Sequence, residues 1–263
     1  MISAFADGFA ELAKKPLLLA VALIGTAINV GVMILASDSY MNVFVNMMVL
    51  GEVPEATVME MPFFIFTSYA ADIAVILVAM TTSLAAGFFT LFAYSRMVAS
   101  KKTGLREGLS FATSKITEAL FLSIFYMAAL FLFALSAFLL FAAGVSFEGV
   151  EAITFLLFIA LCAFGIYCYV KLFFTPLFMA LEGMKLKKAL AESWRWTAGK
   201  FIPLLFFLII AWAVTAMVSG IAFAASDAIA VDEVSAAVAI IGFCIAGAYY
   251  SIVLVKFFSG LRH

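Results

Sequence analysis

The sequence predicts an all-α protein, a polytopic transmembrane helical bundle of six spans, and three observations carry this prediction. The 263 residues are 67% hydrophobic and 12% charged, with a mean hydropathy of +1.22, whereas soluble domains are about one half apolar and about one quarter charged. Six apolar runs each supply the roughly 20 residues that a helix needs to cross about 30 Å of hydrocarbon. All 15 lysines and arginines fall on one side of the membrane once these runs are drawn as spans.

The six spans follow from nearly uninterrupted apolar stretches, which are residues 17–37, 70–95, 118–145, 153–176, 201–225 and 235–258. Backbone polar groups find no water in hydrocarbon, so helices are the expected form. Residues 38–62 include an apolar stretch before Gly51, and we expect it to form a short helix in the outer interface. Thr175 and Pro176 stand at the end of the fourth run, where proline ends or bends a helix. We expect one transmembrane domain over residues 1–263.

The cations set the predicted orientation. Lysines and arginines near span ends stay in the cytoplasm, and the three connections on the opposite side contain none, while holding nine of the 16 carboxylates. We therefore expect a multi-pass protein of the cell membrane with both termini in the cytoplasm. The basic inner face suits anionic lipid headgroups. Because the cations flank spans and form no patch on a soluble face, nucleic acid is not an expected partner.

Three short amphipathic segments precede the first, third and fifth spans. Their apolar stripes are Ile2, Phe5, Phe9 and Leu12, then Leu105, Leu109, Ala112 and Ile116, then Leu186, Leu190 and Trp194. Gly8, Gly108 and Ala189 occupy equivalent places. We predict three amphipathic elbow helices on the cytoplasmic leaflet, each followed by two spans. An even number of crossings per unit makes a parallel threefold repeat, with units of about 1–100, 101–180 and 181–263. The alternative is that any segment entering a membrane looks amphipathic.

Asp72 and Lys171 are the ionisable residues nearest the hydrocarbon. An ionisable side chain at membrane depth is a candidate member of an ion or proton path. The alternative is that both are structural. Counting along the spans places Asp72 near the outer boundary and Lys171 near the inner one, where its stem extends to the interface. At opposite depths, the two side chains are not expected to form an ion pair.

The candidate lipid contacts gather before the third and fifth spans. Trp194, Arg195 and Trp196 combine amphipathic rings with a cation at headgroup level, and they serve either as a simple interfacial anchor or as a specific headgroup site. The further candidates are Lys187, Lys188, Lys101 and Lys102.

Catalytic and metal chemistry have little support in the sequence. The three cysteines lie in apolar runs and the one histidine is His263, which leaves no ligand spacing typical of zinc. Phosphate-binding, protease and esterase motifs are absent. We predict a non-enzymatic protein without a metal or cofactor.

The segment from Leu181 to Phe201 resembles a phrase found before the fifth span in a broad family of six-helix bacterial and archaeal membrane proteins. That family includes the membrane domain attached to some glycerophosphodiester phosphodiesterases. The matching residues are Ala189, Ser193, Trp194, Gly199, Lys200 and Phe201, with Gly8, Phe9, Lys14 or Lys15, and Pro16 matching the family's opening phrase, and Gly87 to Arg96 with Gly104 and Leu105 its second elbow. No phosphodiesterase domain is present in this sequence, so no catalytic residues carry over. The resemblance implies a membrane-embedded partner or a lipid-handling role.

Three functions compete. The first is a non-enzymatic protein that organises lipids or a membrane complex through its cytoplasmic amphipathic helices, with membrane lipids and other membrane or cytoplasmic subunits as partners. The alternative is a permease-like subunit of a transporter or exporter that works with a separate ATPase, favoured by size, elbows and parallel repeats. A membrane enzyme acting on lipid needs polar groups clustered at one depth, and the spans hold too few.

Overall fold

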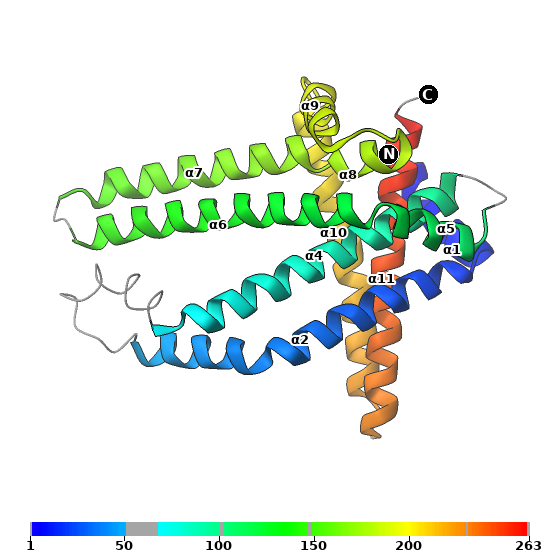
Figure 1. Cartoon of the computed structure of the whole chain (residues 1–263), viewed down its shortest axis with the longest axis horizontal. Coiled ribbons are helices and arrows are strands. Elements are labelled where there is room, and N and C mark those ends of the chain that lie inside the picture. The colour runs from blue at the N-terminus through cyan, green and yellow to red at the C-terminus, as the bar shows by residue number, and fades with distance from the viewer. Residues whose placement is uncertain (1, 51–67, 100–102, 147–148, 230, 262–263) are drawn as a thin grey trace. The chain divides into compact units, whose positions relative to one another are not determined.

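The computed structural model describes residues 2–50, 68–99, 103–146, 149–229 and 231–261, which are helical with no strand among them (Figure 1). The helices are α1 (Ile2–Lys14), α2 (Leu17–Leu50), α4 (Ala70–Ala99), α5 (Leu105–Ser114), α6 (Ile116–Ser146), α7 (Glu151–Leu172), α8 (Thr175–Leu181), α9 (Leu186–Trp196), α10 (Phe201–Asp227) and α11 (Asp232–Gly260). Within these ranges, six helical stretches are long and apolar enough to cross a membrane, with α7 and α8 counted together. The predicted all-α class with six apolar spans is confirmed.

The first long helix differs from its prediction. We expect the first span to end at residue 37 and a separate interfacial helix to follow, but α2 continues without a break to Leu50. No proline or glycine lies between residues 37 and 50 to end it. Its 34 residues extend about 51 Å at 1.5 Å per residue, beyond the roughly 30 Å of a hydrocarbon core. The remainder of that expected outer connection, 51–62, lies outside the described residues.

The fourth span divides into two helices. α7 ends at Leu172, and α8 begins at Thr175 with Pro176 in its first turn. Proline is tolerated there because the first backbone N–H groups of a helix have no partner within it. The predicted break at this proline is confirmed, but the chain beyond it is helical to Leu181 and had been expected as a connection.

Three short helices, α1, α5 and α9, stand before the first, third and fifth long helices, at the places predicted for them. Pro16 separates α1 from α2. Gly199, with φ +73°, follows α9, and this left-handed conformation costs glycine little. The helical state of the three segments is confirmed.

The chain divides into two compact units, and each is described by itself. The first unit comprises Met1–Asn29, Ala85–Ala119 and Val170–His263, and the second comprises Val30–Leu84 and Leu120–Tyr169. All three short helices belong to the first unit.

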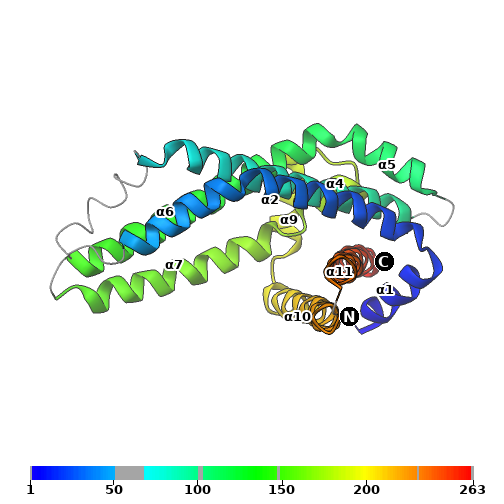
Figure 2. The same ribbon diagram turned by 90° about the horizontal axis from the view of Figure 1, so that it is seen from below.

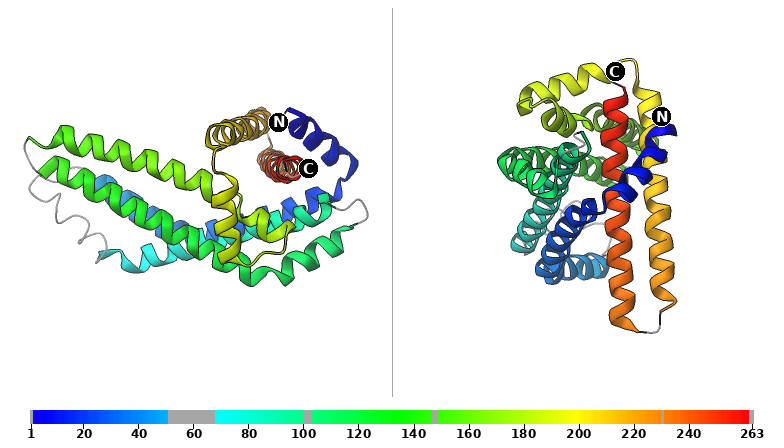
Figure 3. Two further views of the ribbon diagram at one scale, coloured as in Figure 1. Left: turned by 90° about the horizontal axis from the view of Figure 1, so that it is seen from above. Right: turned by 90° about the vertical axis from the view of Figure 1, so that its right-hand side faces the viewer.

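The core of the first unit surrounds α11. α10 packs along α11 as an antiparallel pair, and α1 also packs on α11, so that α10 and α1 flank it (Figures 2 and 3). A Cβ on Gly242 would overlap that of Ala222, so the glycine permits a close approach of the two helices. Phe207 and Phe257 stack with ring centroids 3.5 Å apart. Burial of aromatic rings and close backbone contact therefore hold this unit together.

In the second unit, α6 and α7 run side by side as an antiparallel pair (Figures 1 and 3). A Cβ on Gly165 would lie 2.5 Å from Phe133 Cε2, and one on Gly144 would lie 2.6 Å from Thr154 Oγ1. Eleven residues, close to three turns, separate the two contacts along each helix. The glycines therefore set the register of the pair.

Candidate functional site

The exposed face of α9 brings together four of the predicted lipid contacts. Lys187, Lys188, Trp194 and Arg195 are all exposed, and at 3.6 residues per turn they fall within an arc of about 120°. We call these four residues the α9 basic face.

The opposite face of α9 is buried and carries small side chains. Ala189 and Ser193 are buried there, and α9 packs on α8. The Ser193 hydroxyl donates a hydrogen bond of 2.7 Å to the backbone carbonyl oxygen of Lys171, at the end of α7. Thr197 Oγ1 in turn donates to the carbonyl oxygen of Ser193 at 2.9 Å. These contacts fix the rotation of α9 and point its basic face outward.

Lys171 lies beneath α9. The sequence predicts that its side chain extends to the membrane interface, and the structure shows that the residue is only 4% exposed because α9 covers it. Its Nζ donates to the carbonyl oxygen of Trp194 at 3.3 Å and lies 5.5 Å from the centre of the Trp194 ring. A carbonyl oxygen and a ring face both attract an ammonium group. The structure thus brings together Lys171, which was predicted as a polar residue inside a span, and Trp194, which was predicted as a lipid contact.

Trp196 faces away from the basic face. It is half-buried, and its ring packs against Phe174, Phe178 and Phe258, with centroids 5.1, 6.0 and 5.4 Å away. Trp194, by contrast, is 42% exposed. The sequence carries no signal for this aromatic cluster, because a chain with 30 phenylalanines gives no reason to single out three of them.

Arg195 carries an ion pair to Glu192 with an N···O distance of 2.7 Å. The arginine side chain is 79% exposed, so water and salt screen the pair and it contributes little to stability. Arg195 has five N–H donors, and most of them therefore stay available to a ligand at the surface.

The other predicted site residues lie elsewhere. Asp72, in the second unit, is in the first turn of α4, where the helix dipole favours a carboxylate. Among the described residues it forms no ion pair. Lys101 and Lys102 lie outside the residues that the structure describes.

A small group of polar side chains lies inside the first unit, and the sequence analysis missed it. Cys244 Sγ donates to Thr26 Oγ1 at 3.3 Å. One turn along α2, the buried Oδ1 of Asn29 has no hydrogen-bond partner among the described residues. An asparagine in the middle of an apolar run is itself a signal, because polar side chains in such helices tend to bind across to neighbouring helices.

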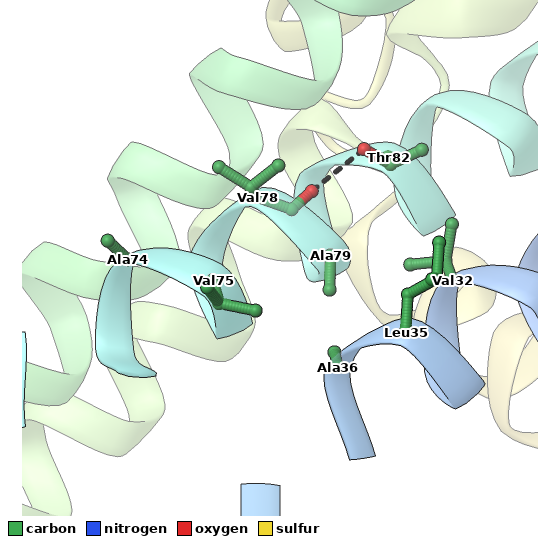
Figure 4. A pocket seen from close by; sticks show the side chains of 8 residues that line it. All are labelled: Val32, Leu35, Ala36, Ala74, Val75, Val78, Ala79 and Thr82. Carbon is green, nitrogen blue, oxygen red and sulfur yellow. Dashed lines mark hydrogen bonds between the residues drawn. The ribbon is translucent and has the colours of Figure 1, made fainter. Parts of the chain in front are cut away.

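An apolar groove of about 490 Å³ lies in the second unit between α2 and α4 (Figure 4). Its lining residues are Val32, Leu35, Ala36, Ala74, Val75, Val78, Ala79 and Thr82. The Thr82 hydroxyl donates to the carbonyl oxygen of Val78 at 2.8 Å, within its own helix. The groove therefore presents alkyl groups and no polar group aimed at a ligand.

No protein-family model, no curated protein and no solved structure matches this chain. The resemblance to the membrane domain of glycerophosphodiester phosphodiesterases stays a prediction from the sequence.

The α9 basic face is chemically suited to binding anions at a membrane surface. Two ammonium groups and a guanidinium supply positive charge, and tryptophan rings are enriched at the depth of the lipid headgroups. Within the described ranges, no three histidine, cysteine or acidic side chains come together as metal ligands.

Proposed function

We propose that this protein is a non-enzymatic multi-pass membrane protein that organises anionic lipids, or a membrane complex, through the α9 basic face. The observation that supports this most is the two-sided construction of α9. Its buried Ala189 and Ser193 anchor the helix, while Lys187, Lys188 and Arg195 point outward. A fixed helix presents its charges to a ligand without a further loss of backbone conformational entropy.

The expected strength of this interaction follows from the charge count. A lysine or arginine near an anionic leaflet contributes about 1 kcal/mol, so three of them contribute about 3 kcal/mol at moderate salt. The anionic leaflet is the cytoplasmic one, and the proposal therefore includes the orientation predicted from the cations, with both termini in the cytoplasm of a cell-membrane protein.

The proposal is tested by counting lipids on the purified protein. Wild type and the triple variant Lys187→Gln, Lys188→Gln, Arg195→Gln are extracted from the same membranes, and native mass spectrometry measures bound phosphatidylglycerol and phosphatidylethanolamine. We expect the triple variant to lose most of the anionic lipid and none of the zwitterionic lipid. The matched control is Lys14→Gln with Arg106→Gln, which removes exposed cations from α1 and α5. Equal retention by wild type and the triple variant would refute the proposal, and an equal loss in the control would refute the role of α9.

We also propose that the chain is built from three repeat units of about 1–100, 101–180 and 181–263. The order of short helix, long helix, long helix occurs three times, and the additional helix α8 near the end of the second repeat is the one departure among the described helices. The residues at the equivalent places, Gly8, Gly108 and Ala189, are all small and all buried. Small residues allow helices to approach closely, which supports one packing scheme used three times.

A permease-like subunit is the second candidate, and the polar group around Thr26, Asn29 and Cys244 favours it. Polar side chains inside spans mark paths for solutes or ions. Affinity purification from native membranes separates the two functions. A cytoplasmic ATPase in stoichiometric amount would establish the permease and refute the lipid-organising role, whereas lipid alone would do the reverse.

A further inference from the structure

The N-terminal helix α1 docks on the last helix of the chain. The Tyr249 hydroxyl of α11 donates to the carbonyl oxygen of Phe5, 244 residues away in sequence, at 3.4 Å. The rings of Phe9 and Tyr249 stack with centroids 4.1 Å apart. A Cβ on Gly8 would lie only 2.7 Å from Val253 Cγ2. The backbone of α1 therefore lies so close to α11 that residue 8 has no room for a side chain.

Ion pairs complete this contact. Glu11 accepts hydrogen bonds from Lys256 of α11 and from Lys15, each at 3.0 Å, and its side chain is 17% exposed. Lys15 Nζ also donates to the carbonyl oxygen of Met97, on α4, at 2.9 Å. Removing or reversing one partner of an ion pair that is shielded from water is destabilising, because the remaining charge is left without its partner. The end of α1 thus joins the end of α11 to the end of α4.

The other two short helices contact the helices that precede them in the chain. A Cβ on Gly108 of α5 would lie 2.6 Å from Met97 Cγ and 3.4 Å from the carbonyl oxygen of Ala93, both on α4. α9 packs on α8, and its Ser193 binds the end of α7. Each of the two therefore contacts the end of a helix that precedes it in the chain. α1 contacts the last long helix, α11, and its Phe5 ring lies 5.6 Å from the Phe207 ring of α10.

We propose that α1 packs on the last long helices, α10 and α11, in the way that α5 and α9 pack on the helices before them. The α1–α11 contact then closes the chain non-covalently into a cycle of its three repeats. This rests on the proposed repeat and is independent of lipid binding. The α1–α11 contact holds this cycle closed, and α1 covers Tyr249 and Val253 of α11.

The first experiment links α1 to α11 with a disulfide. Cys162 and Cys168 are replaced by alanine and Cys244 by serine, which keeps a hydroxyl near Thr26; Gly8→Cys and Val253→Cys are then introduced. The 2.7 Å approach of a Cβ on residue 8 to Val253 Cγ2 fits the Cβ separation of about 3.5–4.5 Å that a disulfide needs. The control carries Gly8→Cys, Ser235→Cys and Val253→Ala, so that the Val253 methyl group that a Cβ on residue 8 would meet is absent from both proteins. Position 235 is 18 residues or about 27 Å from position 253 along α11.

We expect mild oxidation in native membranes to form an intramolecular disulfide in the test pair at least about tenfold faster than in the control. The rate follows the fraction of molecules in which the two thiols lie together, and a tenfold difference in that fraction corresponds to about 1.4 kcal/mol. Maleimide labelling of the reduced protein in SDS confirms that both thiols are present and unmodified. Two such thiols that form no disulfide in the native membranes would refute the proposal. A disulfide between two copies would also refute it, because α1 would then dock on a neighbouring chain.

The second experiment leaves the glycine in place and exchanges charges. Glu11→Lys sets like charges against Lys15 and Lys256, and Lys256→Glu in the same chain restores an attractive pair. Hydrogen exchange of α1 amides, followed by mass spectrometry, reports undocking. We expect the single variant to exchange about tenfold faster and the double variant to recover most of the protection. Glu192→Lys, in the exposed pair with Arg195, is the control and leaves α1 unchanged. Unaltered exchange in Glu11→Lys would refute the role of the ion pairs in closing the cycle.

Discussion

The crossing of α2 and α4 gives the sharpest test of how this chain packs. A Cβ on Gly25 would lie 2.5 Å from Thr90 Cγ2, while the next atoms, Thr90 Cβ and Oγ1, lie at 3.8 and 3.9 Å. Gly25→Ala therefore overlaps one methyl group, and its next neighbours lie at ordinary contact distances. Thr90→Ser removes that methyl and keeps the hydroxyl, which donates to the carbonyl oxygen of Gly87 at 2.8 Å.

The expected cost follows from this geometry. Overpacking of a well-packed contact costs about 1–3 kcal/mol, and the better helix preference of alanine offsets about 0.5–1 kcal/mol of it, so we expect Gly25→Ala to lower the free energy of unfolding by about 1 kcal/mol. The double variant Gly25→Ala, Thr90→Ser should recover all but a few tenths of it, since only ordinary contacts at 3.8 Å and beyond remain. The control is Gly31→Ala on the same helix, where a Cβ meets nothing within 4 Å. Alanine is a better helix former, so this variant should gain about 0.5–1 kcal/mol.

Reversible unfolding in mixed micelles, with increasing SDS and circular dichroism as the readout, measures wild type and the three variants under one condition. A Gly25→Ala protein as stable as wild type would show that the two helices do not cross at this glycine. A double variant as unstable as the single one would show that the cost arises somewhere other than the Thr90 methyl group.

Two further predictions concern the first unit. Ser193→Ala should lower the free energy of unfolding by about 1–3 kcal/mol, because the buried carbonyl oxygen of Lys171 loses the hydrogen bond from the Ser193 hydroxyl. The same SDS titration measures this change, and Ser110→Ala, at an exposed position, is the control with an expected change near zero. Equal stabilities of Ser193→Ala and wild type would contradict the hydrogen bond. Burial by itself would raise the pKa of Glu11, but hydrogen bonds from two lysines outweigh it and hold that pKa below its ordinary value of 4.5. A carboxyl with a lowered folded pKa contributes fully above the unfolded value and loses that contribution as pH falls through the folded one. Protection of α1 amides, corrected for intrinsic exchange rates, should therefore be constant above about pH 5 and fall below pH 4.5, and Glu11→Gln should show little of this acid loss.

The local features of this chain were predictable. Hydrophobic runs of span length exclude a soluble fold, and Pro16 and Pro176 mark real breaks because proline lacks a backbone donor. Short amphipathic stretches gave the three short helices at the right places. The end of α2 was not predictable in this way, because apolar residues with no breaker after residue 37 read equally as an interfacial helix or as a continued one.

The candidate site was predicted only in part. All four residues of the α9 basic face were predicted from the sequence as lipid contacts, since tryptophan beside cations is typical of a membrane interface. The inward turn of Trp196 and the burial of Lys171 depend on α8 and α9 covering the end of α7, which no local pattern encodes.

By itself, the sequence determined that the chain is helical, where its six apolar spans lie and which residues carry charge at their ends, because these depend on local composition and on the cost of exposing backbone in hydrocarbon. Only the tertiary structure decided which small residues meet a neighbouring helix, how α9 is rotated, and that α1 docks on α11. These depend on contacts between residues as far apart as Phe5 and Tyr249, and no periodicity within a single segment reports a partner that distant.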